Sequence, residues 1–234
     1  MNIADAKVLI TGGSSGIGFE TAKRLQKSGA QVVISSRNEL KLKEAAKILN
    51  VIPIVADISS EKDVISLMQS AYAKLNGLNV VINNAAYGYF DALVDINLDK
   101  FQKMLATNLT GSMLVGREAA KIFIKQNYGN IINISSTAGL AGFANGSAYV
   151  ASKFALKGMT ECWRTELRKH NIRIMLVNPS EVQTNFIANS GREPREINPT
   201  KLEATEIAHL ILSMLEMRDL GFITEATVFA TNPS

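Results

Sequence analysis

The chain has 234 residues, of which 47% are hydrophobic and 20% charged, the composition of a folded globular protein rather than a disordered or fibrous one. No apolar run approaches the roughly 20 residues that cross a bilayer, and residues 1–13 lack the features of a signal peptide, so we expect no membrane partner. The net charge of +4 comes without aromatic interleaving or a nucleic-acid motif, so we expect no nucleic-acid partner.

Short apolar runs alternate with helix-period segments through the first half of the chain. Strands are expected at residues 7–10, 31–34, 51–55 and 78–82, and helices at about 16–28, 39–49 and 61–75. Pro53 cannot donate a backbone hydrogen bond, which argues against a long central strand at 51–55.

The second half continues the alternation. We expect helices at about 98–126, 147–170 and 203–216, and strands at 130–134, 172–177 and 222–229. Residues 189–199 are rich in Gly, Pro, Asn and charge and are read as a loop. The strands are near-continuous in Val, Ile and Leu, which is typical of a parallel sheet buried on both faces. The pattern predicts an α/β fold: a doubly wound, Rossmann-type sheet of about seven strands with helices on both faces, forming a single domain over residues 1–234.

Cysteine and histidine exclude two kinds of site. Cys162 is the only cysteine, which rules out an internal disulfide and favours a reducing, cytoplasmic location; we expect it to be a small core residue. His170 and His209 lack metal-ligand spacing, so we expect no metal site.

Glycines cluster where the first strand meets the first helix, at Gly12, Gly16 and Gly18. Glycine permits a tight strand-to-helix turn and a close approach of the backbone to a pyrophosphate. The helix N-terminus offers unpaired N–H groups to that anion, and Ser14 and Ser15 add hydroxyl donors. The position of the turn predicts dinucleotide binding.

The spacing Thr-Gly-x-x-x-Gly-x-Gly at residues 11–18 resembles the signature of the short-chain dehydrogenase/reductase family. Residues 83–86, Asn-Asn-Ala-Ala, and 179–184, Pro-Ser-Glu-Val-Gln-Thr, are similar to two further family elements, with Ala86 and Ser180 where the family has glycine. The resemblance implies that a nicotinamide cofactor is bound by Gly12, Ser14, Ser15, Gly16, Ile17, Gly18, Arg37, Asp57, Ile58, Asn84, Ala85, Tyr149, Lys153, Pro179, Val182 and Thr184.

Tyr149 and Lys153 are four residues apart, so on a helix they share one face. A neighbouring ammonium favours the phenolate and lowers the pKa of a tyrosine toward the working range of a proton donor. Taken by itself, the pair is more typical of a helix surface than of an active site.

Two further polar residues complete the pattern. A hydroxyl follows the apolar strand 131–134, at Ser135 or at Ser136, where it could stabilise charge on a substrate oxygen. Asn108, taken alone, is a helix-bending or core amide. The family's spacing selects Ser136, and the resemblance implies that Asn108, Ser136, Tyr149 and Lys153 form a catalytic tetrad in which the asparagine holds a water.

The end of the second strand predicts which nicotinamide is bound. Enzymes that use NAD place an acid there for the ribose 2′-hydroxyl, but this chain has Ser36 followed by Arg37. A guanidinium suits a 2′-phosphate, so we expect NADP(H) rather than NAD(H). Glu39 could bring a carboxylate near the ribose, but it fits better in the first turn of the next helix.

Together these features predict an oxidoreductase that transfers a hydride between NADPH and a carbonyl substrate, a ketone or aldehyde, with Tyr149 as general acid/base. The alternatives are an NAD-linked alcohol or hydroxy-acid dehydrogenase, a 3-oxoacyl-carrier-protein reductase and a non-catalytic dinucleotide sensor. We expect residues 87–93, 137–145 and a short substrate loop at about 185–200 to surround an apolar or mixed substrate pocket. Arg192 and Arg195 of that loop could meet an anionic substrate or be solvated charges. The resemblance also implies a homodimer or homotetramer.

Overall fold

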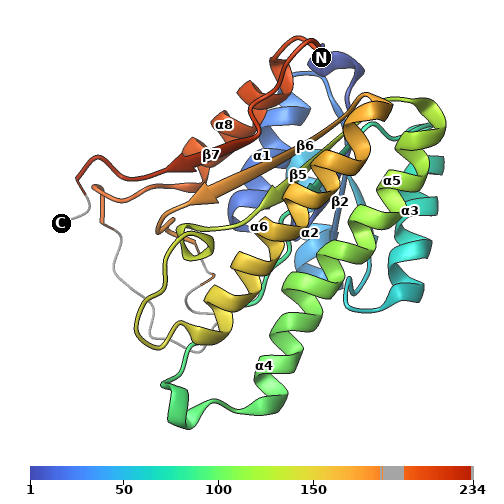
Figure 1. The fold of residues 1–234 in the computed structure, drawn as a ribbon. Coiled ribbons are helices and arrows are strands. Elements are labelled where there is room, and N and C mark those ends of the chain that lie inside the picture. The colour runs from blue at the N-terminus through green and yellow to red at the C-terminus, as the bar shows by residue number, and fades with distance from the viewer. Residues whose placement is uncertain (185, 187–197, 233–234) are drawn as a thin grey trace.

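The computed structural model describes residues 1–184, 186 and 198–232 (Figure 1). Its centre is one seven-stranded sheet in the order β3-β2-β1-β4-β5-β6-β7, and every neighbouring pair is parallel, which confirms the predicted sheet. The strands are β1 (Lys7–Thr11), β2 (Gln31–Ser36), β3 (Ile52–Val55), β4 (Val80–Asn83), β5 (Gly129–Ile134), β6 (Ile172–Pro179) and β7 (Glu225–Val228).

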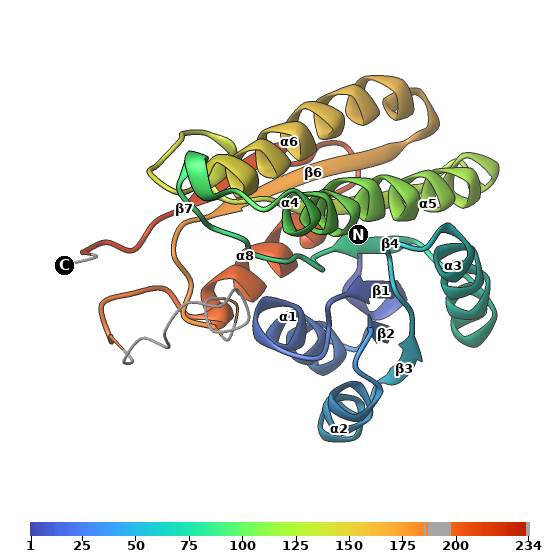
Figure 2. The same cartoon turned by 90° about the horizontal axis from the view of Figure 1, so that it is seen from below.

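Helices cover both faces of the sheet (Figures 1 and 2). One face carries α1 (Gly16–Lys27), α2 (Glu39–Leu49) and α8 (Ala204–Glu216). The other carries α3 (Glu61–Leu75), α4 (Leu98–Leu105), α5 (Ser112–Gln126) and α6 (Ser147–Leu167). Successive side chains of a strand point to opposite faces, so within β1 Val8 and Ile10 join the first core while Leu9 joins the second. Because alternate apolar residues of a strand enter different cores, both faces of the sheet are apolar.

Asparagine marks the ends of several helices. Asn38 caps the N-terminus of α2 by accepting a hydrogen bond from the Lys41 N–H. Asn50, Asn76 and Asn127 end α2, α3 and α5 in the left-handed conformation, with φ between 49° and 52°. Asparagine tolerates this conformation better than most side chains. The local sequence therefore favours the end of each helix at its asparagine.

Some element boundaries differ from the expectations. The helix expected at 98–126 is divided by a π-helical segment, Ala106–Gly111, between α4 and α5. The helix expected to reach residue 170 ends at Leu167 and continues as a short 3₁₀ turn, and the last strand is confined to Glu225–Val228. Strand β3 is short and lies at the sheet edge, as its proline predicted.

Two other expectations concern the surface. Cys162 is exposed, so its prediction as a core residue was wrong: α6 turns Leu156 and Thr160 toward the core and residue 162 away from it. The loop predicted at 189–199 falls mostly outside the described residues. Among the residues that the structure describes, no helix combines the length and apolar character needed to span a membrane.

The strand order reverses between β1 and β4, which positions the site. From β1 the chain runs outward to β2 and β3, and then crosses back to β4 on the other side of β1. The loops after β1 and β4 therefore diverge, leaving a crevice at the carboxyl ends of these strands, where open α/β sheets bind ligands.

Candidate active site

A cavity of about 720 Å³ opens at this edge of the sheet. Of the residues predicted to bind the cofactor or to act in catalysis, all line it except Gly18 and Asn108. Tertiary structure thus brings together side chains from the ends of β1, β2, β4, β5 and β6 and from α6.

The glycine-rich turn has the backbone that only glycine adopts easily. Gly12 and Gly16 have φ of +67° and +56°. A Cβ on Gly18 would lie 2.5 Å from the carbonyl oxygen of Gly12, so this glycine is needed for packing under the turn. Ser15 precedes α1 without using its side chain to cap the helix. The N–H groups of the first turn of α1 and the Ser15 hydroxyl are therefore suited to binding an anion.

Thr11 and Asn84 tie this turn to the end of β4. The Thr11 hydroxyl oxygen accepts hydrogen bonds from the N–H groups of Asn84 and Ala85, both at 3.1 Å. The Asn84 amide nitrogen donates to the carbonyl oxygens of Thr11 and Gly12, at 3.0 and 3.1 Å. Asn84 lines the cavity, but its donors shape the turn.

Ala86 and Ser180, which replace glycines of the family pattern, both line the cavity. Neither has a positive φ, so the backbone at both positions is one that an ordinary side chain adopts. The two departures from the pattern impose no backbone strain.

Arg37 and Asp57 form the far end of the cavity, where β2 and β3 end. The Arg37 Nη1 lies 3.9 Å from the Asp57 Oδ2, and about half of the Arg37 side chain is exposed. Burial would raise the pKa of Asp57, but hydrogen bonds from Ser59 and the charges of Arg37 and Lys103 outweigh it and lower that pKa. Glu39 lies in the first turn of α2, as expected, where its carboxylate pairs with Lys43 at 2.7 Å.

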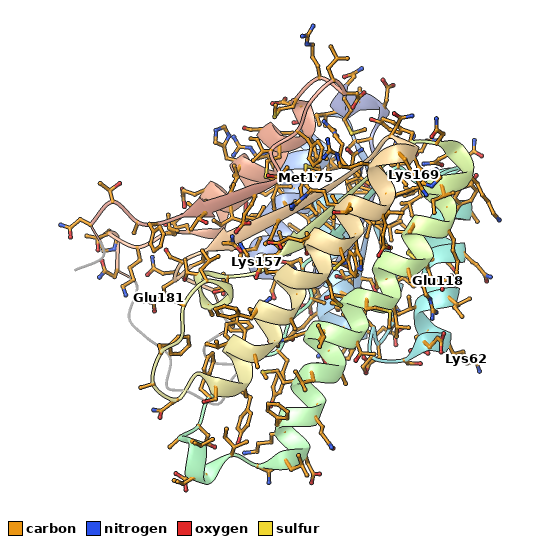
Figure 3. The ribbon with its side chains drawn as sticks, in the orientation of Figure 1. Lys62, Glu118, Lys157, Lys169, Met175 and Glu181 are labelled. Atoms are coloured by element: carbon orange, nitrogen blue, oxygen red, sulfur yellow. The ribbon has the colours of Figure 1, made fainter. Side chains whose placement is uncertain are left out.

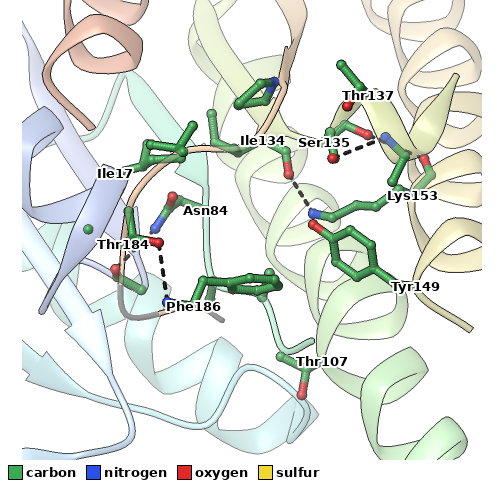
Figure 4. Close-up of a pocket in the computed structure, with 18 of the residues that line it drawn as sticks. Ile17, Asn84, Thr107, Ile134, Ser135, Thr137, Tyr149, Lys153, Thr184 and Phe186 are labelled. Carbon is green, nitrogen blue, oxygen red and sulfur yellow. Dashed lines mark hydrogen bonds between the residues drawn. The ribbon is translucent and has the colours of Figure 1, made fainter. Parts of the chain in front are cut away.

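Tyr149 and Lys153 share one face of α6 at the other end of the cavity (Figure 4). The Lys153 Nζ lies 5.6 Å from the centre of the Tyr149 ring and donates a hydrogen bond to the Ile134 carbonyl oxygen at 2.9 Å. Burial lowers the pKa of Lys153 to about 8. Burial also raises the pKa of Tyr149 to about 12, against the hydrogen bond with Ser136, which lowers it. The pKa of Tyr149 thus moves opposite to the expected direction, because desolvation dominates.

Ser135 and Ser136 have different roles. The Ser135 hydroxyl is buried and donates to the Lys153 carbonyl oxygen at 3.4 Å, so it fastens α6 to the end of β5. The Ser136 hydroxyl accepts a hydrogen bond from the Ala138 N–H at 3.1 Å, and Ser136 lines the cavity together with Tyr149. Of the two serines, Ser136 is the one whose side chain lowers the pKa of Tyr149, against the effect of burial.

Asn108 is buried in the π-helical segment and uses its whole side-chain amide on protein groups. Its oxygen accepts from the Tyr87 N–H at 2.7 Å, and its nitrogen donates to the Tyr87 carbonyl oxygen at 2.9 Å and to the Ser152 hydroxyl at 3.2 Å. Ser152 in turn donates to the Tyr149 carbonyl oxygen at 2.7 Å. Asn108 therefore links the loop after β4 to the helix turn that carries Tyr149.

Comparison with known proteins identifies the family. The family model for short chain dehydrogenases matches residues 6–195. The NADP-dependent 3-hydroxy acid dehydrogenase of Schizosaccharomyces pombe is 33% identical, over 99% of this chain and 95% of that protein. This chain belongs to the short chain dehydrogenase family.

Two other family members are similar over most of the chain. The L-xylulose reductase of Caenorhabditis elegans is 35% identical over 82% of this chain and 78% of that protein. A metagenomic short-chain oxidoreductase solved with NADP superposes with a TM-score of 0.84 at 29% identity, covering 98% of this chain and 99% of that one.

At the substrate end of the cavity of this short chain dehydrogenase, the lining residues agree only in part with the predicted ones. Phe90, Leu140 and Phe143 line it as predicted, but Tyr89 is buried against Met104 and Ala148 instead. Phe186 lies in the predicted substrate loop and lines the cavity, whereas Phe229 lines it without having been predicted. Among the described residues, no group of three or more His, Cys, Asp or Glu side chains could hold a metal ion.

Proposed function

We propose that this protein is an NADP(H)-dependent carbonyl reductase in which Tyr149 is the general acid. The observation that carries the proposal is that Ser136, Tyr149 and Lys153 line the same cavity as the glycine-rich turn and Arg37. A proton donor and a nucleotide site in one cavity are the two parts that reduction of a carbonyl by a nicotinamide requires.

The residues at the nucleotide end fit a dinucleotide phosphate. Gly12 and Gly16 open the backbone, Ser15 leaves the start of α1 free for a pyrophosphate, and Arg37 offers a guanidinium to a 2′-phosphate. When bound, NADPH supplies the hydride that reduces the carbonyl carbon. The name of the Schizosaccharomyces pombe relative, an NADP-dependent enzyme, supports this choice of cofactor.

The protein's own residues handle the substrate oxygen. Ser136 donates a hydrogen bond that orients the oxygen and stabilises its developing charge. Tyr149 transfers its phenolic proton to that oxygen, which completes the alcohol. Lys153, held on the Ile134 carbonyl, stabilises the phenolate that remains. Asn108 acts as a positioning residue, because its amide holds the loop after β4 against α6.

The reverse reaction, oxidation of a hydroxy acid, is a second candidate for the same residues. The resemblance to a 3-hydroxy acid dehydrogenase favours it. In that direction Tyr149 would act as the base and accept the proton of the substrate hydroxyl.

The test is an NADPH-oxidation assay across ketones, keto esters, keto acids, keto sugars and acyl thioesters, with a Tyr149→Phe variant beside the wild type. We expect turnover of at least one class and a loss of about 10²–10⁴-fold in kcat for the variant. Titration of NADPH against both proteins separates binding from chemistry. Near-normal turnover by the variant contradicts the role of Tyr149, and binding without turnover of any class favours a dinucleotide sensor.

We also propose that the chain folds as one domain and assembles as a homodimer or homotetramer. Both predictions have direct measurements. A single cooperative unfolding transition supports one domain, and light scattering during size-exclusion chromatography gives the mass of the assembly.

A further inference from the structure

Aromatic rings lie beside the ring of Tyr149, whose hydroxyl the proposed reaction uses. The ring of Phe90 lies 5.2 Å from that of Tyr149 and the ring of Phe186 lies 5.7 Å from it, measured between centroids. Figure 4 shows Phe186 extending across the cavity toward Tyr149. Phe143 adds a further ring, 6.2 Å from Phe90. These phenylalanines come from three separate segments, after β4, before α6 and after β6, so the aromatic wall is a product of the tertiary fold.

The wall continues to the rim of the cavity as exposed apolar surface. Leu140, Phe143 and Phe229 line the cavity and are 40%, 47% and 66% exposed. Covering apolar surface is favourable by about 25 cal/mol per Å², so a ligand with its own apolar area gains affinity here. Apolar rings at the mouth of a concave site are typical of binding surfaces for apolar ligands.

Charge is arranged differently at the two ends of the cavity. Among the described lining residues, the charged side chains are Arg37, Asp57, Lys153 and Glu181. The first two lie at the nucleotide end and pair with each other. The Lys153 ammonium is buried on the Ile134 carbonyl, and its side chain serves the tyrosine.

Glu181 follows the carboxyl end of β6 (Figure 3) and pairs with Lys201 at 2.6 Å. That ion pair leaves little net charge beside the end of β6, and the Lys153 ammonium is held on the Ile134 carbonyl. A substrate carboxylate beside Tyr149 would therefore lie against aromatic rings, where an unpaired charge is costly to desolvate. The hydroxyl groups of a sugar would meet rings that cannot hydrogen-bond them.

We propose that the substrate is a neutral ketone that carries an aromatic or similarly bulky apolar group. The proposal rests on the carbonyl reduction proposed above and specifies the substrate class of that same site. The rings of Phe90, Phe143 and Phe186 receive the apolar group, and the carbonyl oxygen points to Ser136 and Tyr149. Reduction adds a hydride from NADPH to the carbonyl carbon and the Tyr149 proton to the oxygen, so the product is the corresponding neutral alcohol.

Three ketones test the proposal through kcat/KM at saturating NADPH. They are methyl 4-acetylbenzoate, 4-acetylbenzoic acid, which is a carboxylate at neutral pH, and 2-butanone. The first two differ in charge, and the third lacks the ring. We expect the methyl ester to exceed both others by about tenfold or more. Reduction of the acid or of 2-butanone as fast as the ester overturns the proposal, and so does turnover confined to keto acids or keto sugars. The acid also tests whether Arg192 and Arg195, which lie outside the described residues, favour an anionic substrate.

The outcomes separate this proposal from the one on which it rests. Turnover that favours the acid or 2-butanone contradicts the substrate class and leaves carbonyl reduction standing. A protein that binds NADPH but reduces no ketone, keto acid, keto sugar or thioester contradicts both.

Matched variants assign the selectivity to the aromatic wall. Phe143→Ala is expected to lower kcat/KM for the methyl ester about fivefold or more, mainly through KM, while 2-butanone changes less than about twofold. Phe143→Leu keeps most of the apolar volume, so its kcat/KM for the methyl ester should lie between those of the wild type and Phe143→Ala. Phe154→Ala is the control, because Phe154 on α6 is 45% exposed, close to the 47% of Phe143, but does not line the cavity. An unchanged NADPH affinity shows that each variant is folded, and equal effects of Phe143→Ala on all three ketones contradict the proposal.

Discussion

The side-chain amide of Asn108 holds both backbone groups of Tyr87, accepting from its N–H at 2.7 Å and donating to its carbonyl oxygen at 2.9 Å. Asn108 lies in the π-helical segment between α4 and α5, and Tyr87 lies in the loop after β4. A third hydrogen bond, to Ser152, extends the contact to α6. One buried amide thus joins three segments that meet beside the cavity.

Replacing this amide is expected to be costly. Asn108→Ala leaves the N–H and carbonyl of Tyr87 and the Ser152 hydroxyl without this partner, so the free energy of unfolding should fall by about 2–3 kcal/mol. Urea unfolding measures the change. Thr110→Ala is the control, because Thr110 is exposed in the same π-helical segment and its removal should cost less than about 0.5 kcal/mol. Equal stability of the two variants would show that the Asn108 contacts contribute little.

The buried ammonium of Lys153 makes stability depend on pH. Burial lowers its pKa from 10.5 to about 8, so between these values the unfolded chain holds a proton that the folded protein has lost. Folded-state stability is therefore penalised below pH 8 and recovers as the pH rises toward 10.5. The stability of the cofactor-free wild type relative to Lys153→Met should rise by about 2 kcal/mol from pH 7 to pH 9.5.

Denaturant unfolding at several pH values measures this difference. Lys125→Met, which removes an exposed ammonium from α5, controls for the change in net charge. A difference between wild type and Lys153→Met that stays constant from pH 7 to pH 9.5 contradicts a lowered pKa for Lys153.

Arg37 is expected to discriminate between the two nicotinamide cofactors. Its guanidinium is half exposed beside Asp57 and can turn toward a 2′-phosphate. Loss of a charge-assisted contact worth about 1.5–3 kcal/mol should raise the Kd for NADPH about 10- to 100-fold in Arg37→Ala, with little change for NADH. Fluorescence titration with both cofactors measures it, and Lys47→Ala on α2 controls for the general loss of positive charge. Equal losses for NADPH and NADH would place the 2′-phosphate elsewhere.

Two glycine-to-alanine substitutions are expected to act in opposite directions. Gly12 has a φ of +67°, and a Cβ there would lie 2.8 Å from the Ala85 Cα, so Gly12→Ala should cost about 1–3 kcal/mol and weaken NADPH binding. Gly158 lies within α6 with nothing within 4 Å of an added Cβ. Gly158→Ala should therefore stabilise the protein by about 0.5–1 kcal/mol and leave NADPH affinity unchanged. Thermal unfolding and cofactor titration of both variants provide the comparison, and wild-type NADPH affinity in Gly12→Ala would contradict the assigned role of the turn.

Local sequence patterns predict much of the fold. Strands buried on both faces must be apolar along their length, and amphipathic helices repeat near 3.6 residues, so their alternation predicts a parallel sheet covered on both sides. The same reasoning places the glycine turn, because a backbone with positive φ at Gly12 and Gly16 demands glycine whatever surrounds it. Pro53 correctly marked an edge strand, because it lacks the N–H that a central strand uses.

The π-helical segment at residues 106–111 could not be predicted in the same way. The helix-period pattern continues through it, and the contacts that accompany it, from Asn108 to Tyr87 and Ser152, join residues 21 and 44 positions apart. The exposure of Cys162 could not be predicted from the sequence either, because it depends on which side of α6 packs against the sheet.

For this protein, the sequence by itself determined the sheet, the glycine turn and the order of Asn108, Ser136, Tyr149 and Lys153 along the chain. Tertiary structure alone decided that the Ser135 hydroxyl is buried on the Lys153 carbonyl, that burial raises the tyrosine pKa, and that Phe90 and Phe186 flank the tyrosine ring. The physical reason is that hydroxyl direction, desolvation and ring contact depend on what the fold brings alongside a residue, whereas helix, strand and turn preferences depend mainly on its neighbours in the chain.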